Sequence, residues 1–116
     1  MGNPRKFPAN EMVFKIKADF LKSLAHPARL SIIEYLKKGE SSVGRMVGDL
    51  GIEQSSLSKH LATLRQNGIL SSRQEKLNVY YSIKDKDIYS VLRPISKILR
   101  KKLKESAEIL NSLGKT

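Results

Sequence analysis

Two short amphipathic segments lie only three residues apart near the middle of the chain, and this spacing constrains the fold most. Residues 43–50 carry apolar side chains on one helical face and are followed by Gly51, a typical helix C-cap. Residues 54–67 repeat leucine at positions 57, 61 and 64 and are followed by Gly68. The sequence therefore predicts a helix-turn-helix over residues 43–68.

The segment after this motif changes to the period of a strand. Residues 69–74 and 79–83 are rich in β-branched and aromatic side chains, and Glu75 to Asn78 separate them. This pattern predicts a two-stranded hairpin over residues 69–83, which would stand beside the helix-turn-helix as a wing.

Two further helices are expected before residue 43. Apolar residues recur at helical spacing over residues 11–25 and stop at His26-Pro27, because proline disfavours helix in the residue before it. A second helix is expected from Pro27 to a cap at Gly39, with Leu30, Ile33 and Leu36 on its apolar face and Ser41 and Ser42 available to cap the next helix. Residues 1–10, which hold two prolines and two cations, predict a flexible basic N-terminal arm.

The last part of the chain predicts one long helix within residues 86–113. An apolar stripe continues from Ile88 almost to the end, and a continuous helix of this length would span about 39 Å. Pro94 is expected to kink this helix or to mark its true start. The whole chain then reads as mainly α with a small β-hairpin (α+β), in the order α-α-α-α-β-β-α. Residues 11–116 are expected to form a single domain.

The charge of the chain points to a polyanionic partner. It holds 22 Lys and Arg against 11 Asp and Glu, a net charge of +11 that folding does not require. Double-stranded DNA is the favoured partner, because a membrane-binding helix would want Phe or Trp and the chain has three Phe and no Trp. No apolar run reaches the roughly 18 residues needed to span a bilayer, and residues 1–10 lack the apolar core of a signal peptide, so a cytoplasmic protein is expected.

The second helix of a helix-turn-helix lies in the major groove, and residues 54–67 offer suitable side chains for that position. Gln54 can pair with adenine, and Lys59 can reach guanine or a phosphate. Backbone amides at the start of this helix would also favour phosphate. The alternative is that these residues only cap and solubilise a surface helix. The expected DNA contacts on this helix are Gln54, Ser55, Ser56, Ser58, Lys59 and Thr63.

The tip of the predicted hairpin gathers Arg73, Lys76 and Asn78, which can approach phosphates or a narrow minor groove. We interpret Arg73 and Lys76 as adding to a positive surface and not as pairing within the loop, although Glu75 lies between them. Solvated loop charge is the alternative interpretation.

Four stretches of sequence resemble the ArsR/SmtB family of small winged-helix repressors. They are Leu-Ala-His-Pro-Ala-Arg-Leu at residues 24–30, Gln-Ser-Ser-Leu-Ser-Lys-His-Leu at 54–61, Leu-Arg-Gln-Asn-Gly-Ile-Leu at 64–70 and Val-Tyr-Tyr-Ser-Ile at 79–83. The resemblance, which covers about residues 11–110, implies a homodimer that pairs through residues 11–25 and 86–113, binds imperfect inverted repeats and releases DNA when an effector binds. The apolar residues expected in that interface are Phe14, Phe20, Leu92, Ile95, Leu99 and Leu103.

The metal sites of the best-known relatives have no counterpart in this sequence. Arsenic and lead sensors of the family place cysteines where this chain has Ser42 and Gly44, and the chain contains no cysteine. Zinc sensors use an Asp-x-His start on the last helix, where Asp87 is followed here by Tyr89, and later ligands are replaced by Arg100 and Leu103. The only histidines, His26 and His60, lie in separate motifs. We therefore expect no metal and no cofactor, with His26 as a helix-junction residue and His60 packed or touching phosphate.

The favoured function is a dimeric, sequence-specific transcriptional repressor whose effector is unidentified. The alternative is an architectural protein that binds any duplex, which the run Arg100, Lys101, Lys102 and Lys104 encourages. A winged-helix protein-interaction module is a further alternative. An enzyme is not expected, because the sequence has no glycine-rich phosphate loop, no cysteine nucleophile and no plausible Ser-His-Asp set.

Overall fold

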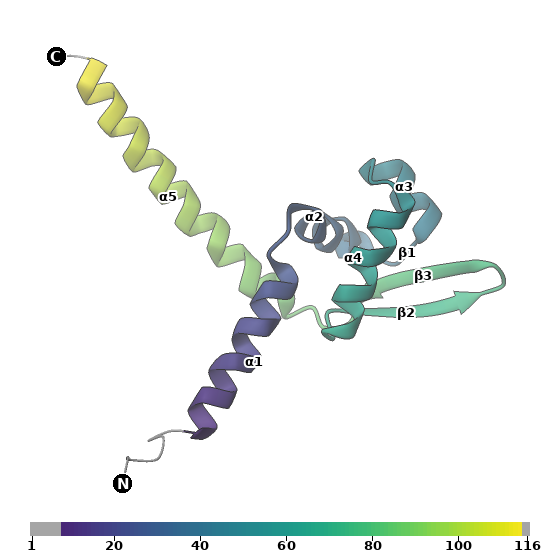
Figure 1. Ribbon diagram of the computed structural model, residues 1–116. Coiled ribbons are helices and arrows are strands. Elements are labelled where there is room, and N and C mark those ends of the chain that lie inside the picture. Colours follow the sequence, from purple (N-terminus) through teal and green to yellow (C-terminus); the bar gives the residue numbers. More distant parts are fainter. Residues whose placement is uncertain (1–7, 115–116) are drawn as a thin grey trace, which may run out of the picture. The chain divides into compact units, whose positions relative to one another are not determined.

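The computed structural model describes residues 8–114. The chain divides into two units, and the boundary along the sequence lies between Lys84 and Asp85. The first unit holds, in order, α1 (Pro8–Leu24), α2 (Pro27–Tyr35), the 3₁₀ helix η1 (Leu36–Lys38), β1 (Ser41–Ser42), α3 (Val43–Leu50), α4 (Gln54–Gln66), β2 (Leu70–Glu75) and β3 (Asn78–Ile83) (Figure 1). The second unit contains α5 (Ile88–Gly114). The predicted class, mainly α with a small antiparallel sheet, is confirmed.

Helix α1 begins at Pro8, three residues before the predicted start. Proline is favoured in a first helical turn, and the negative charge of Glu11 interacts favourably with the positive end of the helix dipole. The predicted flexible arm is therefore wrong for residues 8–10, which are helical. The rest of that arm, residues 1–7, lies outside the described residues.

Helix α2 is capped by a histidine. His26 is extended, and its Nδ1 accepts a hydrogen bond from the backbone N–H of Ala28 at 3.0 Å. The prediction for Leu30 is wrong, because this side chain is exposed whereas Ile32, Ile33 and Leu36 are buried. The centre of the buried face lies between Ile32 and Ile33, and Leu30 is about 110° away from it at 3.6 residues per turn.

The sheet has three strands in the order β1-β3-β2, one more than predicted. Strand β1 is only two residues long and pairs Ser41 with Tyr81 and Ser42 with Tyr80. Two residues are too few to show a period, which explains why the sequence pattern did not reveal this strand. Ser41 is thus a strand residue, whereas Ser42 caps α3 as predicted, because its hydroxyl accepts from Arg45 N at 3.2 Å.

The predicted wing forms a hairpin over residues 70–83, with a tighter turn than expected. The register runs from Leu70 opposite Ile83 to Glu75 opposite Asn78, which leaves a two-residue turn. Lys76, the first residue of that turn, has φ +56°, and hairpins with two-residue turns favour such left-handed backbone. In Figure 1 the hairpin extends well beyond α3 and α4.

The predicted helix-turn-helix is present and forms the centre of the first unit. Gly51 ends α3 with φ +65°, a left-handed conformation that a glycine adopts without strain. Met46 of α3 and Leu57, Leu61 and Leu64 of α4 are completely buried. Each such side chain stabilises the fold by roughly 1.5–3 kcal/mol. The apolar side of α4 is therefore held firmly, and its other side is left for solvent or a partner.

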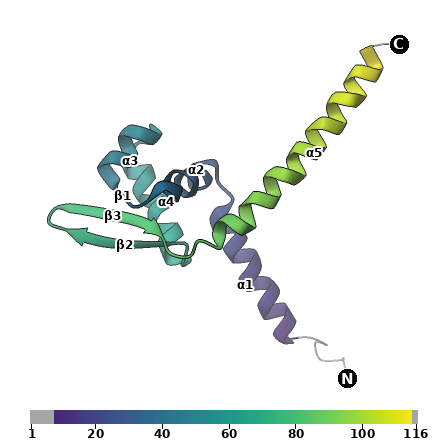
Figure 2. The ribbon, with the colours of Figure 1, turned by 180° about the vertical axis from the view of Figure 1, so that it is seen from behind.

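Helix α5 runs without interruption through Pro94 (Figure 2). Pro94 does not start the helix, so that alternative is wrong. Its missing N–H removes one backbone bond in the second turn, and the helix continues on both sides of it. Within residues 8–114, no helix is both long and apolar enough to cross a membrane.

Candidate nucleic-acid interface

Helix α4 presents one polar side beside its buried leucines. Gln54 and Lys59 are exposed, as are Ser55, Ser56 and Ser58, whereas Thr63 is half-buried. The leucines that face the core fix the rotation of the helix, because turning α4 would expose them and bury polar groups. The structure thus brings five of the six predicted contacts onto one exposed surface and places Thr63 at its edge.

The N-terminus of α4 is already capped by an acidic residue. The Glu53 carboxylate accepts hydrogen bonds from the Ser55 N–H at 3.2 Å, the Ser55 hydroxyl at 2.5 Å and the Ser56 hydroxyl at 3.5 Å. The hydrogen bond from the Ser55 side chain is the largest cause of the lowered pKa of Glu53, followed by the backbone bond from Ser55. This finding corrects the expectation that the helix start favours phosphate, because a negative charge occupies that position.

Glu53 could hardly have been recognised as the cap from the sequence. Caps are usually Ser, Thr, Asp or Asn, and a glutamate reaches the same amide only through a longer side chain. The Glu53 cap also affects DNA binding, because the hydroxyls of Ser55 and Ser56 donate their protons to Glu53. Within the helix-turn-helix, Ser58 has no carboxylate acceptor of this kind.

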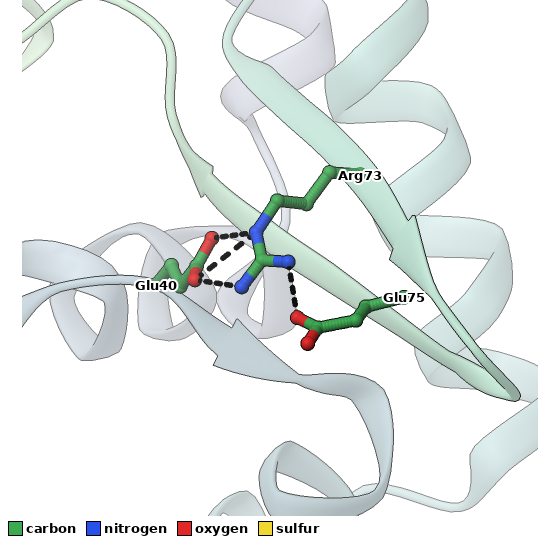
Figure 3. A network of polar contacts seen from close by, with 3 residues as sticks. All are labelled: Glu40, Arg73 and Glu75. Carbon is green, nitrogen blue, oxygen red and sulfur yellow. Dashed lines mark hydrogen bonds and ion pairs between the residues drawn. The ribbon is translucent and has the colours of Figure 1, made fainter.

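The guanidinium of Arg73 on β2 is held by two carboxylates (Figure 3). Its Nε and Nη2 donate to Glu40, with Nε at 2.9 Å from Oε2, and its Nη1 donates to Glu75 Oε2 at 2.6 Å. The interpretation that Arg73 does not pair within the loop is therefore wrong. Three of its five N–H donors are used, which leaves two for another acceptor.

Strand order explains why Glu40 was missed as the partner of Arg73. Arg73 is opposite Tyr80 on β3, and Tyr80 is opposite Ser42 on β1. The arginine side chain crosses the ring of Tyr80, 4.5 Å from its centroid, and reaches Glu40 just before β1. Hydrogen bonding to Glu40 and Glu75 raises the pKa of Arg73, and the bond to Arg73 lowers the pKa of Glu40.

The tip of the wing carries a feature that the sequence analysis overlooked. Lys76 and Asn78 are exposed there, as predicted. Between them Leu77 is 97% exposed, more than any other large apolar side chain in the part of the chain that the structure describes. Its position in a turn leaves it open to solvent, so the tip combines a cation, an amide and an apolar surface.

The two histidines lie side by side despite their separation in sequence. Their ring centroids are 4.3 Å apart, and His60 Nδ1 accepts from Arg29 Nε at 3.2 Å. Arg29 also donates to the carbonyl of Ser23 at 3.2 Å, so the cluster joins α1, α2 and α4. Burial, and then the electrostatic influence of His26 and Arg29, lower the pKa of His60.

This cluster does not have the composition of a metal site. The Nδ1 of His26 accepts from the Ala28 backbone, and the Nδ1 of His60 accepts from Arg29, which is a cation. Across residues 8–114, no group of three or more His, Cys, Asp or Glu residues is placed to hold a metal ion.

The residues expected in a dimer interface are mostly uncovered within one chain. Phe14 of α1 is 66% exposed, and on α5 the exposed fraction is 45% for Ile95, 51% for Leu99 and 69% for Leu103. Phe20 and Leu92 are half-buried. So many exposed apolar side chains on each of two helices are unusual for a monomer.

Comparison with known proteins agrees with this geometry. Residues 26–72 match the bacterial regulatory protein family arsR. The chain is 38% identical over 105 residues to Rv0081 of Mycobacterium tuberculosis, an uncharacterized HTH-type transcriptional regulator, with 90% of this chain and 92% of the relative covered. The chain belongs to the arsR family. The resemblance that the four sequence motifs indicated is thereby confirmed.

Solved structures of related proteins share the fold. The crystal structure of Rv0081 matches with a TM-score of 0.74, covering 82% of this chain and 96% of that one. NolR from Sinorhizobium fredii matches with a TM-score of 0.73 at 34% identity, covering 84% and 96%. The transcriptional repressor BigR from Xylella fastidiosa matches with a TM-score of 0.67 at 30% identity, covering 81% and 96%. This arsR protein is a winged helix-turn-helix regulator of transcription, and its relatives are regulators, not enzymes.

Proposed function

We propose that the protein is a homodimeric, sequence-specific repressor that binds an imperfect inverted repeat. Helix α4 lies in the major groove, and the β2–β3 wing lies on the backbone or in the minor groove. The observation that carries the proposal is the exposed polar side of α4, held in place by three completely buried leucines. The names of two relatives support repression: BigR, and a biofilm growth-associated repressor of Agrobacterium fabrum that is 42% identical over 76 residues.

On α4, Gln54 and Lys59 supply the sequence-dependent contacts. Gln54 pairs with adenine through N6 and N7, and Lys59 reaches guanine acceptors or a phosphate. Ser58 donates to an acceptor on the DNA, whereas Ser55 and Ser56 offer their oxygen lone pairs because their protons bond to Glu53. Thr63 contributes at the edge of this surface.

On the wing, Lys76 and Asn78 approach the phosphates or the minor groove from the turn. Arg73 contributes through its two remaining N–H donors, in competition with the carboxylates that hold it. With Glu40 and Glu75 the cluster has a net charge of −1, so a phosphate gains less there than at Lys76.

The dimer forms through the apolar sides of α1 and α5. Burying Phe14, Phe20, Leu92, Ile95, Leu99 and Leu103 against a second copy removes the exposed apolar surface from water. A two-fold dimer presents two α4 helices about 34 Å apart, which is one turn of DNA. Release of DNA does not use the metal sites of the family, because Ser42 is engaged in capping α3 and Gly44 has no side chain.

Selection of bound sites from a random duplex pool, at one stated salt concentration, tests the proposal. We expect enrichment of a two-fold repeat whose half-sites lie about 10 base pairs apart, with a preference of at least ~10³ over random duplex. A Gln54→Ala variant serves as the control and should select a site with relaxed sequence at matching positions in both halves. If no sequence is enriched, the architectural alternative replaces this proposal.

A further inference from the structure

Helix α5 has a second surface, opposite its apolar one. Its cations recur mostly at spacings of three or four residues, so they share one side of the helix. All of them are exposed, and none forms an ion pair with another residue in the part of the chain that the structure describes. We call this surface the basic face; it consists of Arg93, Lys97, Arg100, Lys101 and Lys104.

The first two thirds of this helix carry a large share of the positive charge of the chain. Residues 88–104 hold six Lys and Arg and no Asp or Glu, against a net charge of +11 for the whole chain. The helix-turn-helix and wing together, residues 43–83, hold five Lys and Arg against three Asp and Glu. The region proposed to read DNA therefore supplies little of the charge that attracts DNA.

We propose that the basic face of α5 is a second surface for duplex DNA, which binds phosphates without regard to sequence. From Arg93 to Lys104 the face spans about 17 Å at ~1.5 Å per residue. Duplex DNA presents a negative charge every ~1.7 Å along its axis, so a duplex lying along the face offers about ten phosphate charges to these five cations. The inference goes beyond the proposed function, since it concerns a different surface and does not depend on what α4 reads.

An anionic membrane fits this surface less well than DNA. A helix lying on a membrane must insert its apolar side, and in the dimer that side of α5 faces a second copy. Residues 88–114 contain neither Trp nor Phe, the side chains that anchor such helices at a bilayer surface. A rigid row of cations facing water is better matched by a polyanion that needs no insertion.

The test is a salt titration of the full-length protein with a mixed-sequence duplex of about 30 base pairs. The variant R100Q/K101Q/K104Q removes three cations of the basic face and keeps the length and polarity of the side chains. We expect the slope of log K against log salt to become less steep by about 2 to 3, and affinity at 0.1 M salt to fall on the order of 10²-fold. The matched control K15Q/K17Q/K22Q removes the same charge from exposed positions of α1 and should leave the slope unchanged.

A charge-preserving variant guards against a purely structural effect. R93K/R100K keeps every cation and should retain the slope of the native protein. An unchanged slope in R100Q/K101Q/K104Q overturns the inference, as does an equal loss in the α1 control. The inference is also overturned, in favour of a membrane, if R100Q/K101Q/K104Q loses binding to vesicles of anionic lipid while its salt slope on DNA is unchanged. A failure of the proposed function would be seen in a different experiment: Gln54→Ala would then select the same DNA site as the native protein.

Discussion

Helices α4 and α5 are both amphipathic, but they use their two sides differently. In α4 the leucines are completely buried within the chain, and the polar side is small, uncharged except for Lys59 and Arg65, and hydrogen-bonded to Glu53. In α5 the apolar side chains from Ile95 onward are 45–69% exposed, and the other side is densely cationic. The difference teaches that local sequence recognition and overall attraction to DNA need not come from the same element.

A core substitution should separate the two helices most clearly. Leu61→Ala removes a completely buried side chain of α4, and we expect the free energy of unfolding to fall by about 2–5 kcal/mol. Leu110→Ala on α5 is the matched control; its side chain is 68% exposed within one chain, so at a protein concentration low enough to keep the chain monomeric it should cost much less. Urea denaturation at constant protein concentration measures both. Equal losses would mean that the apolar side of α5 is as tightly packed as that of α4.

A charge on the apolar side of α5 tests its role in association. We expect Leu103→Glu to weaken the dimer by about 2 kcal/mol or more, roughly 30-fold in the dissociation constant, because a carboxylate would be buried against the second copy. Sedimentation equilibrium measures this. Glu105→Gln, which lies two residues away on another side of α5, should leave the dimer intact. A Leu103→Glu protein that stays dimeric at the same concentration would contradict the proposed interface.

Loss of one reading side chain should have a smaller, sequence-dependent effect. Gln54→Ala is expected to cost about 1–3 kcal/mol at the selected site, and almost nothing on random duplex. Gln66→Ala, at the other end of α4, is the control and should change neither affinity. An equal loss on both duplexes would show that Gln54 contributes no discrimination between bases.

The order and type of the larger elements could be predicted from the sequence, because leucine spacing and glycine caps act locally. The helix-turn-helix, the hairpin and the long last helix follow from such patterns. Contacts between distant residues could not be predicted. Glu40 meets Arg73 only because a two-residue strand adds to the sheet, and His26 meets His60 only because α2 packs against α4.

The wing offers a test of whether charge near the reading region helps or hinders binding. Glu40→Gln removes one carboxylate from Arg73, and we expect a few-fold tighter binding to duplex because a phosphate then meets less competition. Arg73→Ala should weaken binding and reduce the salt slope by about 1. If both variants weaken binding equally with the native slope, Arg73 positions the wing and does not contact phosphate.

The smallest expected effect is a dependence of stability on pH. It should come from α4, which holds His60, and not from α5, which has no histidine. The pKa of His60 is lowered in the fold by burial, by His26 and by Arg29, whereas in the unfolded chain it returns to about 6.5. The stability linked to neutral His60 is therefore complete above about pH 6.5 and is lost as the pH falls through the lower, folded value. Urea denaturation of the native protein and of His60→Gln, which keeps an acceptor for Arg29, measures the difference. We expect the native protein to lose more stability than the variant between pH 7 and pH 5, and parallel curves would contradict this.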